Sequence, residues 1–97
     1  MKFEWDENKR NINLQKHGID FQEAYKIFNN PLLIKMDRRF NYGEERYVGL
    51  GVTQKCVVLI VYTEPTEETI RIISIRKATK HEREIYEKYL TNRLGKS

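Results

Sequence analysis

Two adjacent cations, Arg76 and Lys77, end a strand-like run that begins at Thr69, and a helix start follows them at once. The stretch Thr69–Glu82 thus places both side chains at a rigid strand end, beside the backbone N–H groups of a helix N-terminus. Because such N–H groups and cationic side chains both attract anions, the junction predicts a binding site for a phosphate group.

The basic surplus of the chain lies in its last third. Residues 69–97 hold eight Lys and Arg against three Glu, whereas residues 1–68 hold ten basic and eleven acidic side chains. A local surplus of this kind favours a surface that binds a polyanion over a role in general solubility. A solvated helix face is the alternative interpretation.

Other residues suited to chemistry on phosphate lie earlier in the chain. These candidates are His17, Tyr42, Glu44, Glu45, Arg46, Tyr47 and Arg71. RNA carries its own nucleophile, the 2′-hydroxyl, so its cleavage needs a base, cations for the charged phosphorane and an acid for the departing 5′-oxygen. A Glu or His can act as the base, and the planar guanidinium of Arg binds phosphate oxygens through two hydrogen bonds. Composition does not decide which residue takes which role.

Metal chemistry is not expected. Two scattered His, one Cys and no cluster of carboxylates give no spacing typical of a metal site, and the single Cys excludes a disulfide framework. We therefore expect neither a metal nor another cofactor.

Strand alternation suggests where these side chains point. In residues 69–77 the even positions, which end in Arg76, alternate with the odd positions, which include Arg71 and Lys77, so each face is expected to carry apolar residues and a cation. An Arg on such a face must pair with a carboxylate or lie at the open end of the sheet, and a structural pair of Arg76 with Glu45 is one alternative. In residues 45–53, Gly49 and Gly51 share a face that can admit either a ligand or a packed helix.

The hydrophobic pattern predicts five strands and three helices. The expected strands are 3–5, 32–37, 45–53, 56–63 and 69–77, and the expected helices begin at the caps Asp6, Asp20 and Thr79. The spacings Asp20–Glu23 and Thr79–Glu82 each predict a capping box. The apolar run Val57–Val61 predicts a central strand covered on both faces. The order βααββββα favours an α+β fold, a mostly antiparallel sheet with helices packed on it, in one domain over residues 1–97. The N-terminus lacks an apolar signal segment and no run is long enough to cross a bilayer, so we expect a cytoplasmic protein without a membrane partner.

Several stretches of the chain resemble the BrnT-type toxins of toxin–antitoxin systems, which belong to the RelE-like ribonucleases. The matching stretches are Phe3–Asp6 with Lys9, Asn13–Leu14, Lys16–Gly18, Phe21 with Glu23–Ala24, Gly43–Tyr47, Tyr62–Thr63, Arg71–Ser74, Arg76–Thr79, Glu82 and Tyr86. Single pieces are weak, but the combination covers nearly the whole chain and is specific.

The resemblance implies a RelE-like fold, metal-independent ribonuclease activity and neutralisation by a BrnA-like antitoxin. It further implies a complex, expected as a 2:2 heterotetramer, that binds operator DNA through the antitoxin. The residues that it favours for catalysis are Glu45, Arg46, Arg71 and Arg76, and those that it favours for RNA binding are Lys16, His17, Tyr47 and Lys77. In this hypothesis Arg46 and Arg76 hold the scissile phosphate, Glu45 is the base, and a tyrosine or His17 is the acid.

Two other interpretations remain open at this stage. A non-catalytic module can use the same basic face to bind nucleic acid or an acidic protein. Alternatively, the cations are structural and hold the last helix to the sheet.

Overall fold

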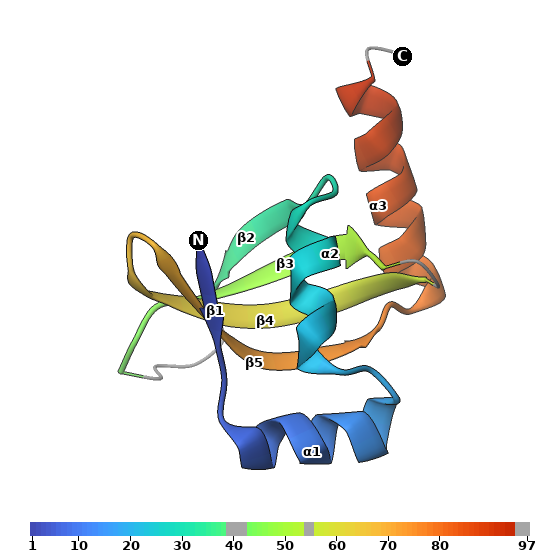
Figure 1. Cartoon of the computed structure of the whole chain (residues 1–97). Helices are drawn as coiled ribbons and strands as arrows, with labels where there is room; N and C mark the ends of the chain where they lie inside the picture. Colours follow the sequence, from blue (N-terminus) through green and yellow to red (C-terminus); the bar gives the residue numbers. More distant parts are fainter. Residues whose placement is uncertain (39–42, 54–55, 95–97) are drawn as a thin grey trace.

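The computed structural model describes residues 1–38, 43–53 and 56–94. In chain order the elements are β1 (Lys2–Glu4), α1 (Glu7–His17), η1 (Phe21–Glu23), α2 (Ala24–Phe28), β2 (Leu33–Asp37), β3 (Arg46–Val52), β4 (Val57–Thr66), β5 (Thr69–Lys77) and α3 (Lys80–Arg93). The predicted α+β class and the order βααββββα are confirmed, with a short 3-10 turn, η1, added before the second helix (Figure 1).

The strands form one sheet in the order β1-β5-β4-β3-β2. The segments β2 to β5 make an antiparallel meander, and β1 is added in parallel to β5 at the other edge. The apolar strand β4 is interior, as its continuous hydrophobic run predicts.

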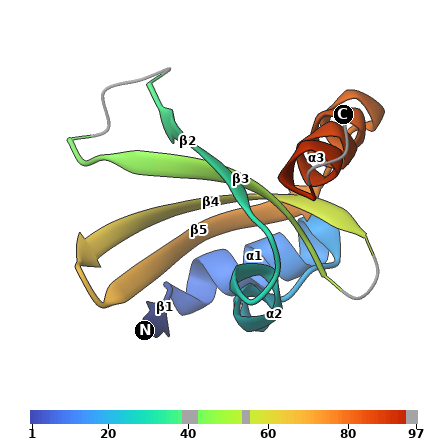
Figure 2. The same cartoon turned by 90° about the horizontal axis from the view of Figure 1, so that it is seen from above.

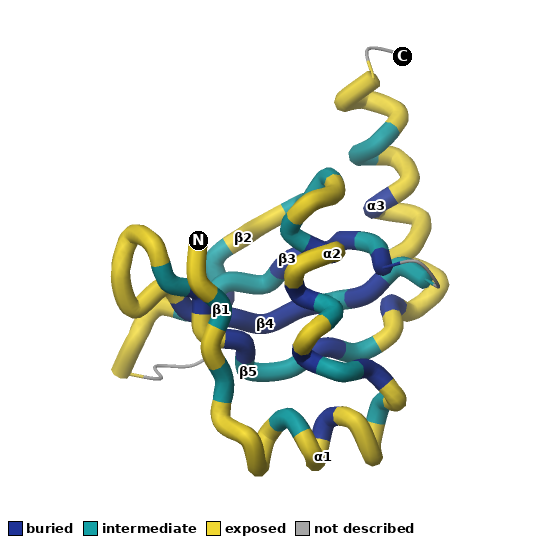
Figure 3. The backbone as a smooth tube through the Cα atoms, in the orientation of Figure 1, coloured by how far each residue is buried: buried dark blue, intermediate teal, exposed yellow. Residues whose placement is uncertain are grey.

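The two faces of this sheet are covered to different extents. Figure 2 shows α1 and α2 on one side of the sheet and α3 on the other side, near one end of the strands. The main core lies under α1, η1 and α2, and includes Phe21, Ile27, Ile60 and Ile75. Within the sheet, the buried residues lie mainly on β3, β4 and β5 (Figure 3). We call the second side the open face, defined by Lys35, Val48, Val61, Ser74 and Arg76, because α3 covers only one end of it.

The helix α3 is anchored at that end by a smaller core. Tyr86 is buried against Leu50 and Ala78, and its hydroxyl donates to the backbone oxygen of Pro31 at 2.7 Å. The predicted capping box is present, since Thr79 Oγ1 accepts from the Glu82 N–H and the Glu82 side chain accepts from the Thr79 N–H. These contacts fix the first turn of α3 beside the end of β5.

The helix α1 is attached to the sheet by a polar side chain. Asn13 is buried and accepts from the Ile75 N–H at 3.1 Å, while its Nδ2 donates to the oxygens of Ile75 and Ile19, both at 2.9 Å. Since β1 pairs with β5 only over residues 69–71, Asn13 supplies the partner that the β5 backbone lacks further along this edge.

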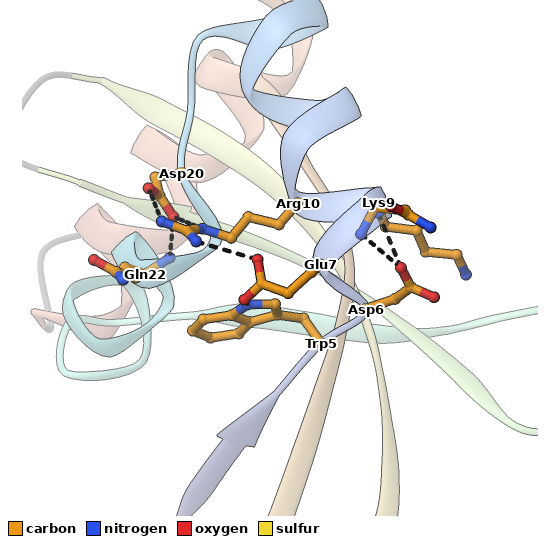
Figure 4. A network of polar contacts seen from close by, with 8 residues as sticks. Trp5, Asp6, Glu7, Lys9, Arg10, Asp20 and Gln22 are labelled. Atoms are coloured by element: carbon orange, nitrogen blue, oxygen red, sulfur yellow. Dashed lines mark hydrogen bonds and ion pairs between the residues drawn. The ribbon is translucent and has the colours of Figure 1, made fainter.

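An arginine clasp joins α1 to η1 on the same side. Arg10 Nε and Nη2 donate to the two carboxylate oxygens of Asp20, both at 2.9 Å, and Nη1 donates to Glu7 (Figure 4). The Arg10 guanidinium holds the pKa of Asp20 below its ordinary value. This pair lies on the covered side of the sheet and is a structural contact.

Two local predictions were wrong. The capping box expected at Asp20–Glu23 does not form: Asp20 accepts from the Gln22 N–H, but the Glu23 side chain pairs with Lys26 at 3.5 Å. In the β4–β5 hairpin, β4 continues to Thr66, so the connection is a turn at residues 67–68 in place of the predicted loop over residues 64–68.

Candidate functional site

A β-bulge decides which cations share a face of the sheet. Ser74 pairs with Val61 whereas Ile72 pairs with Tyr62, so Ile73 is an extra residue on β5. The bulge reverses which positions of β5 point toward the main core. Ile70 and Ile72 before the bulge and Ile75 after it are therefore all buried there. The expected alternation is wrong beyond Ile72 for this reason.

The open face consequently gathers cations from three strands. Arg71 and Arg76 point to the same face although five positions separate them, because the bulge lies between them. The pairing of β2 with β3 places two more cations on this face: Arg46, which lies opposite Asp37, and Lys35, which lies opposite Val48. The structure thus places Arg46, Arg71 and Arg76, three of the four residues predicted to act in catalysis, on one face of the sheet, with Arg76 further along β5 than the other two.

Arg76 is held by a carboxylate. Its Nη1 and Nη2 donate to Glu82 Oε1 and Oε2 at 2.8 and 2.9 Å, and Nη1 also donates to the Lys77 backbone oxygen. Hydrogen bonds from Arg76, and secondarily from Thr79, outweigh the effect of burial and lower the pKa of Glu82 to about 2. Glu82 therefore stays ionised at neutral pH, and Arg76 is fixed in one orientation.

This clasp changes the expected phosphate site at the strand–helix junction. The Glu82 carboxylate occupies the place predicted for an anion, because it binds both Arg76 and the Thr79 N–H. The alternative of a structural arginine pair is borne out for Arg76, but its partner is Glu82 and not Glu45.

A groove of about 580 Å³ nevertheless lies in front of Arg76 on the open face. Its described lining comprises Lys35, Met36, Asp37, Arg38, Val48, Leu59, Val61, Ser74, Arg76 and Glu82. The floor is apolar and the rim is charged. Arg76 therefore contributes a pre-oriented guanidinium to an accessible surface.

The other two arginines of the open face also have carboxylate partners. Arg71 contacts Glu4 at 2.6 Å, with about half of each side chain exposed, and the Arg46 Nε lies 3.5 Å from Glu44. An exposed pair such as Arg71–Glu4 is weak, so a phosphate can displace the carboxylate at small cost.

Glu45 lies at the rim beside Arg71. A small groove of about 260 Å³ is lined by Glu44, Glu45, Tyr47, Thr63, Glu64, Pro65 and Arg71. The Tyr47 hydroxyl donates to Glu45 Oε2 at 3.1 Å, and this hydrogen bond raises the pKa of Tyr47. The Tyr47 ring is stacked on Tyr62. Tyr47 therefore orients the Glu45 carboxylate at the end of the sheet where Arg71 lies.

Lys77 and His17 lie together on the other side of the sheet. Both line a groove of about 530 Å³ that also includes Gly18 and Cys56, and Lys16 precedes His17 at the end of α1. Lys77 pairs with Val58 on β4, one position out of phase with Arg76, so the two neighbouring cations face opposite sides. The structure thus separates the predicted RNA-binding residues Lys16, His17 and Lys77 from the arginines.

The two glycines of β3 admit a packed segment. A Cβ at Gly51 would lie 2.9 Å from Leu32 Cδ1 and 3.0 Å from Ile27 Cγ2, and one at Gly49 would lie 3.0 Å from Leu32 Cδ1. Of the two alternatives for these glycines, the close approach of α2 and the segment after it is the one observed.

Two cations of the open face were missed by the sequence reasoning, namely Lys35 and Arg38. For Lys35 the sequence did contain a signal, the alternation of Leu33, Lys35 and Asp37, which places these three side chains on one side of β2. The candidate Tyr42 lies outside the described residues. Within the described ranges there is no group of three or more His, Cys, Asp or Glu that could hold a metal ion, and no helix long and apolar enough to cross a membrane.

Comparisons with known proteins agree with this architecture. The family model described as the ribonuclease toxin BrnT of type II toxin–antitoxin systems matches residues 5–82. A crystal structure of the Brucella abortus ribonuclease toxin BrnT is similar to this chain, with a TM-score of 0.64 and 27% sequence identity over 82% of this chain and 99% of that chain. None of the curated proteins matches. Because the family match spans most of the sequence, the chain belongs to the BrnT family of ribonuclease toxins of type II toxin–antitoxin systems.

Proposed function

We propose that this toxin cleaves RNA without a metal ion, by attack of the 2′-hydroxyl on the adjacent phosphate. Membership of a type II family implies an RNA substrate and an antitoxin partner. The observation that best supports the open face as the site of this reaction is the bulge at Ile73. It places Arg71 and Arg76 on the same face of the sheet as Arg46. Guanidinium groups on one accessible face suit the charged phosphorane that forms in such a reaction.

The positions of these arginines favour a division of roles. Arg46, Arg71 and Glu45 belong to the same end of the sheet, whereas Arg76 lies about 15 Å further along β5, given the ordinary rise of a strand. We assign the scissile phosphate to Arg46 and Arg71, and a neighbouring phosphate to Arg76. This differs from the sequence-based hypothesis, in which Arg76 holds the scissile phosphate with Arg46.

Glu45 is the general base in this proposal. It is anchored by the Tyr47 hydroxyl and lines the same groove as Arg71, so a bound 2′-hydroxyl can lie between the base and the cation. We assign the acid for the 5′-oxygen to Tyr47, which packs on the covered side of the sheet but reaches Glu45 at the end of the sheet where Arg71 lies. His17 lies on the other side of the sheet, and we assign it with Lys16 and Lys77 to outer contacts with the RNA.

A purified preparation tests this proposal directly. We expect the wild type to cut a bare RNA in excess EDTA, and Glu45→Gln to lower kcat by about 10²–10³-fold, within the range usual for loss of a general base, while RNA binding is retained. Glu87→Gln, at an exposed position of α3, is the charge-matched control. Failure of a folded wild type to cut any RNA would remove the enzymatic part of the proposal.

A non-catalytic binding module is the competing function. The carboxylate pairs of Arg46, Arg71 and Arg76 favour it, as do Glu44 and Glu64, which line the small groove and oppose a phosphate there. It predicts RNA binding in the wild type and in Glu45→Gln alike, with no product from either protein. The same experiment therefore separates the two functions.

The proposal also includes the antitoxin partner. We infer that a BrnA-like antitoxin neutralises this chain in the cytoplasm, in a 2:2 complex that binds operator DNA through the antitoxin. Co-expression with the product of the adjacent gene should restore growth and give a stable complex whose mass, measured by light scattering, equals two copies of each chain. A mass equal to one copy of each would contradict the stoichiometry.

A further inference from the structure

The groove in front of Arg76 holds more positive than negative charge. Its described lining has three cationic side chains, Lys35, Arg38 and Arg76, and two carboxylates, Asp37 and Glu82. Arg76 and Glu82 neutralise each other through the two-bond clasp, and the remaining Lys35, Arg38 and buried Asp37 leave a net charge of +1 in the groove. The charge that a visiting anion meets therefore comes from Lys35 and Arg38.

Neither of these two side chains has an ion-pair or hydrogen-bond partner among the residues that the structure describes. Both residues are exposed, Lys35 on β2 and Arg38 immediately after its last residue. By contrast, Arg71 and Arg76 are hydrogen-bonded to a glutamate, and the Arg46 Nε lies 3.5 Å from Glu44. An anion that binds Lys35 or Arg38 does not have to displace a carboxylate.

The surroundings of Lys35 strengthen its attraction for an anion. It lies opposite Val48 in the sheet, and the next residue across on β4 is Val61, so the groove floor beside it is apolar. An apolar floor lowers the local dielectric and offers no competing donor or acceptor. The Ser74 hydroxyl, opposite Val61 on β5 and in the lining of the same groove, is an additional donor for a phosphate oxygen.

We propose that Lys35 and Arg38 bind a backbone phosphate of the RNA outside the reacting one, and so extend the substrate site from the Glu45 end of the sheet across the groove. This inference rests on the proposed function, because it takes single-stranded RNA as the ligand. Lys35 supplies a compact charge above the apolar floor, whereas Arg38 supplies a planar fork that fits phosphate oxygens. Both residues contact substrate away from the bond that breaks, so they contribute binding and not chemistry.

The test is a binding titration with a short single-stranded RNA that is 2′-O-methylated throughout and cannot be cut. Fluorescence anisotropy is measured over a series of KCl concentrations for the wild type, Lys35→Gln, Arg38→Gln and the control Lys9→Gln on α1. We expect each groove variant to weaken binding about 3–10-fold and to lower the slope of log K against log[salt] by about 0.7, the value for one single-strand phosphate contact. Lys9→Gln should leave both quantities unchanged, and Lys35→Arg should retain most of the affinity.

Cleavage kinetics with unmodified RNA provide the second arm. Lys35→Gln should raise KM by a similar factor and leave kcat within twofold, since the contact is made equally in the ground state and the transition state. If the wild type binds and cuts RNA but Lys35→Gln and Arg38→Gln behave like Lys9→Gln, the inference is wrong and the proposed function stands. If the wild type binds no RNA, both are wrong.

Discussion

Arg76 on β5 and Glu82 in the first turn of α3 are joined by two parallel hydrogen bonds of 2.8 and 2.9 Å. The same carboxylate accepts from the Thr79 N–H, so one side chain caps the helix and orients the guanidinium. A second clasp of the same kind, Arg10 with Asp20, lies on the covered side and has bonds of 2.9 Å. The two clasps form a matched pair, one beside the groove of the open face and one on the covered side.

Variants of the two clasps can separate an effect on RNA binding and cleavage from an effect on protein stability. We expect Arg76→Ala and Arg10→Ala each to lower the free energy of unfolding by about 1–2 kcal/mol, because both break a partly exposed two-bond ion pair. Only Arg76→Ala should also weaken RNA binding and reduce kcat/KM, by about tenfold. Urea denaturation and anisotropy measure the two effects. Equal loss of RNA binding in both variants would show that the Arg76 effect is only structural.

The pH dependence of stability should report Glu82. Its folded pKa, about 2, lies below the ordinary value of 4.5, so its contribution is fully present above pH 4.5 and is lost as the pH falls toward 2. The shift corresponds to at most about 3 kcal/mol, and partial exposure reduces it. Unfolding of Glu82→Gln should therefore depend less on pH between 4.5 and 2 than unfolding of the wild type. Parallel curves for the two proteins would contradict this assignment.

Asn13 should be among the most sensitive polar positions of the fold. Asn13→Ala removes three hydrogen bonds and leaves the buried N–H and carbonyl of Ile75 without a partner, so we expect a loss of roughly 2–4 kcal/mol of unfolding free energy. Asn11→Ala, at an exposed position of the same helix, should change it by less than about 0.5 kcal/mol. Similar effects of both variants in urea denaturation would mean that Asn13 does not hold the β5 edge.

Gly51→Ala tests the close approach on the covered side. The new methyl group would meet Leu32 and Ile27 at 2.9 and 3.0 Å, so we expect a loss of about 1 kcal/mol of unfolding free energy from overpacking. The double variant Leu32→Ala, Gly51→Ala should be more stable than the sum of the single changes predicts, because the methyl group fills part of the space that Leu32 leaves. Strict additivity in a double-mutant cycle would contradict the contact.

The strand and helix order followed from local patterns in the sequence. Alternation, capping residues and the apolar run Val57–Val61 were sufficient because each acts over a few neighbouring residues. The bulge at Ile73 was not predictable in this way, since the run Ile72–Ile75 carries no glycine, and its one polar residue, Ser74, fits ordinary strand alternation equally well. One unpredicted residue moved Arg76 to the other face of β5.

The second feature that the sequence did not predict was the pairing of side chains from distant segments. The sequence required a carboxylate partner for Arg76 but did not identify Glu82, whose place beside β5 depends on how α3 docks through Tyr86. The wrong separation of Arg71 from Arg76 has the other cause, the unpredicted bulge between them. Lys35 was missed because the alternation along β2 gives its side of the strand but not which side of the sheet the helices leave open.

The most direct measurement of the central claim uses one RNA oligonucleotide and its single-substituted copy in excess EDTA. After the cut is mapped, the nucleotide on its 5′ side is replaced by the 2′-deoxy form, and the products are analysed by mass spectrometry. The account predicts a 2′,3′-cyclic phosphate at the cut in the all-RNA substrate, and no cut at that position in the substituted copy. Equal cleavage of both oligonucleotides, or loss of all cleavage on addition of EDTA, would contradict it.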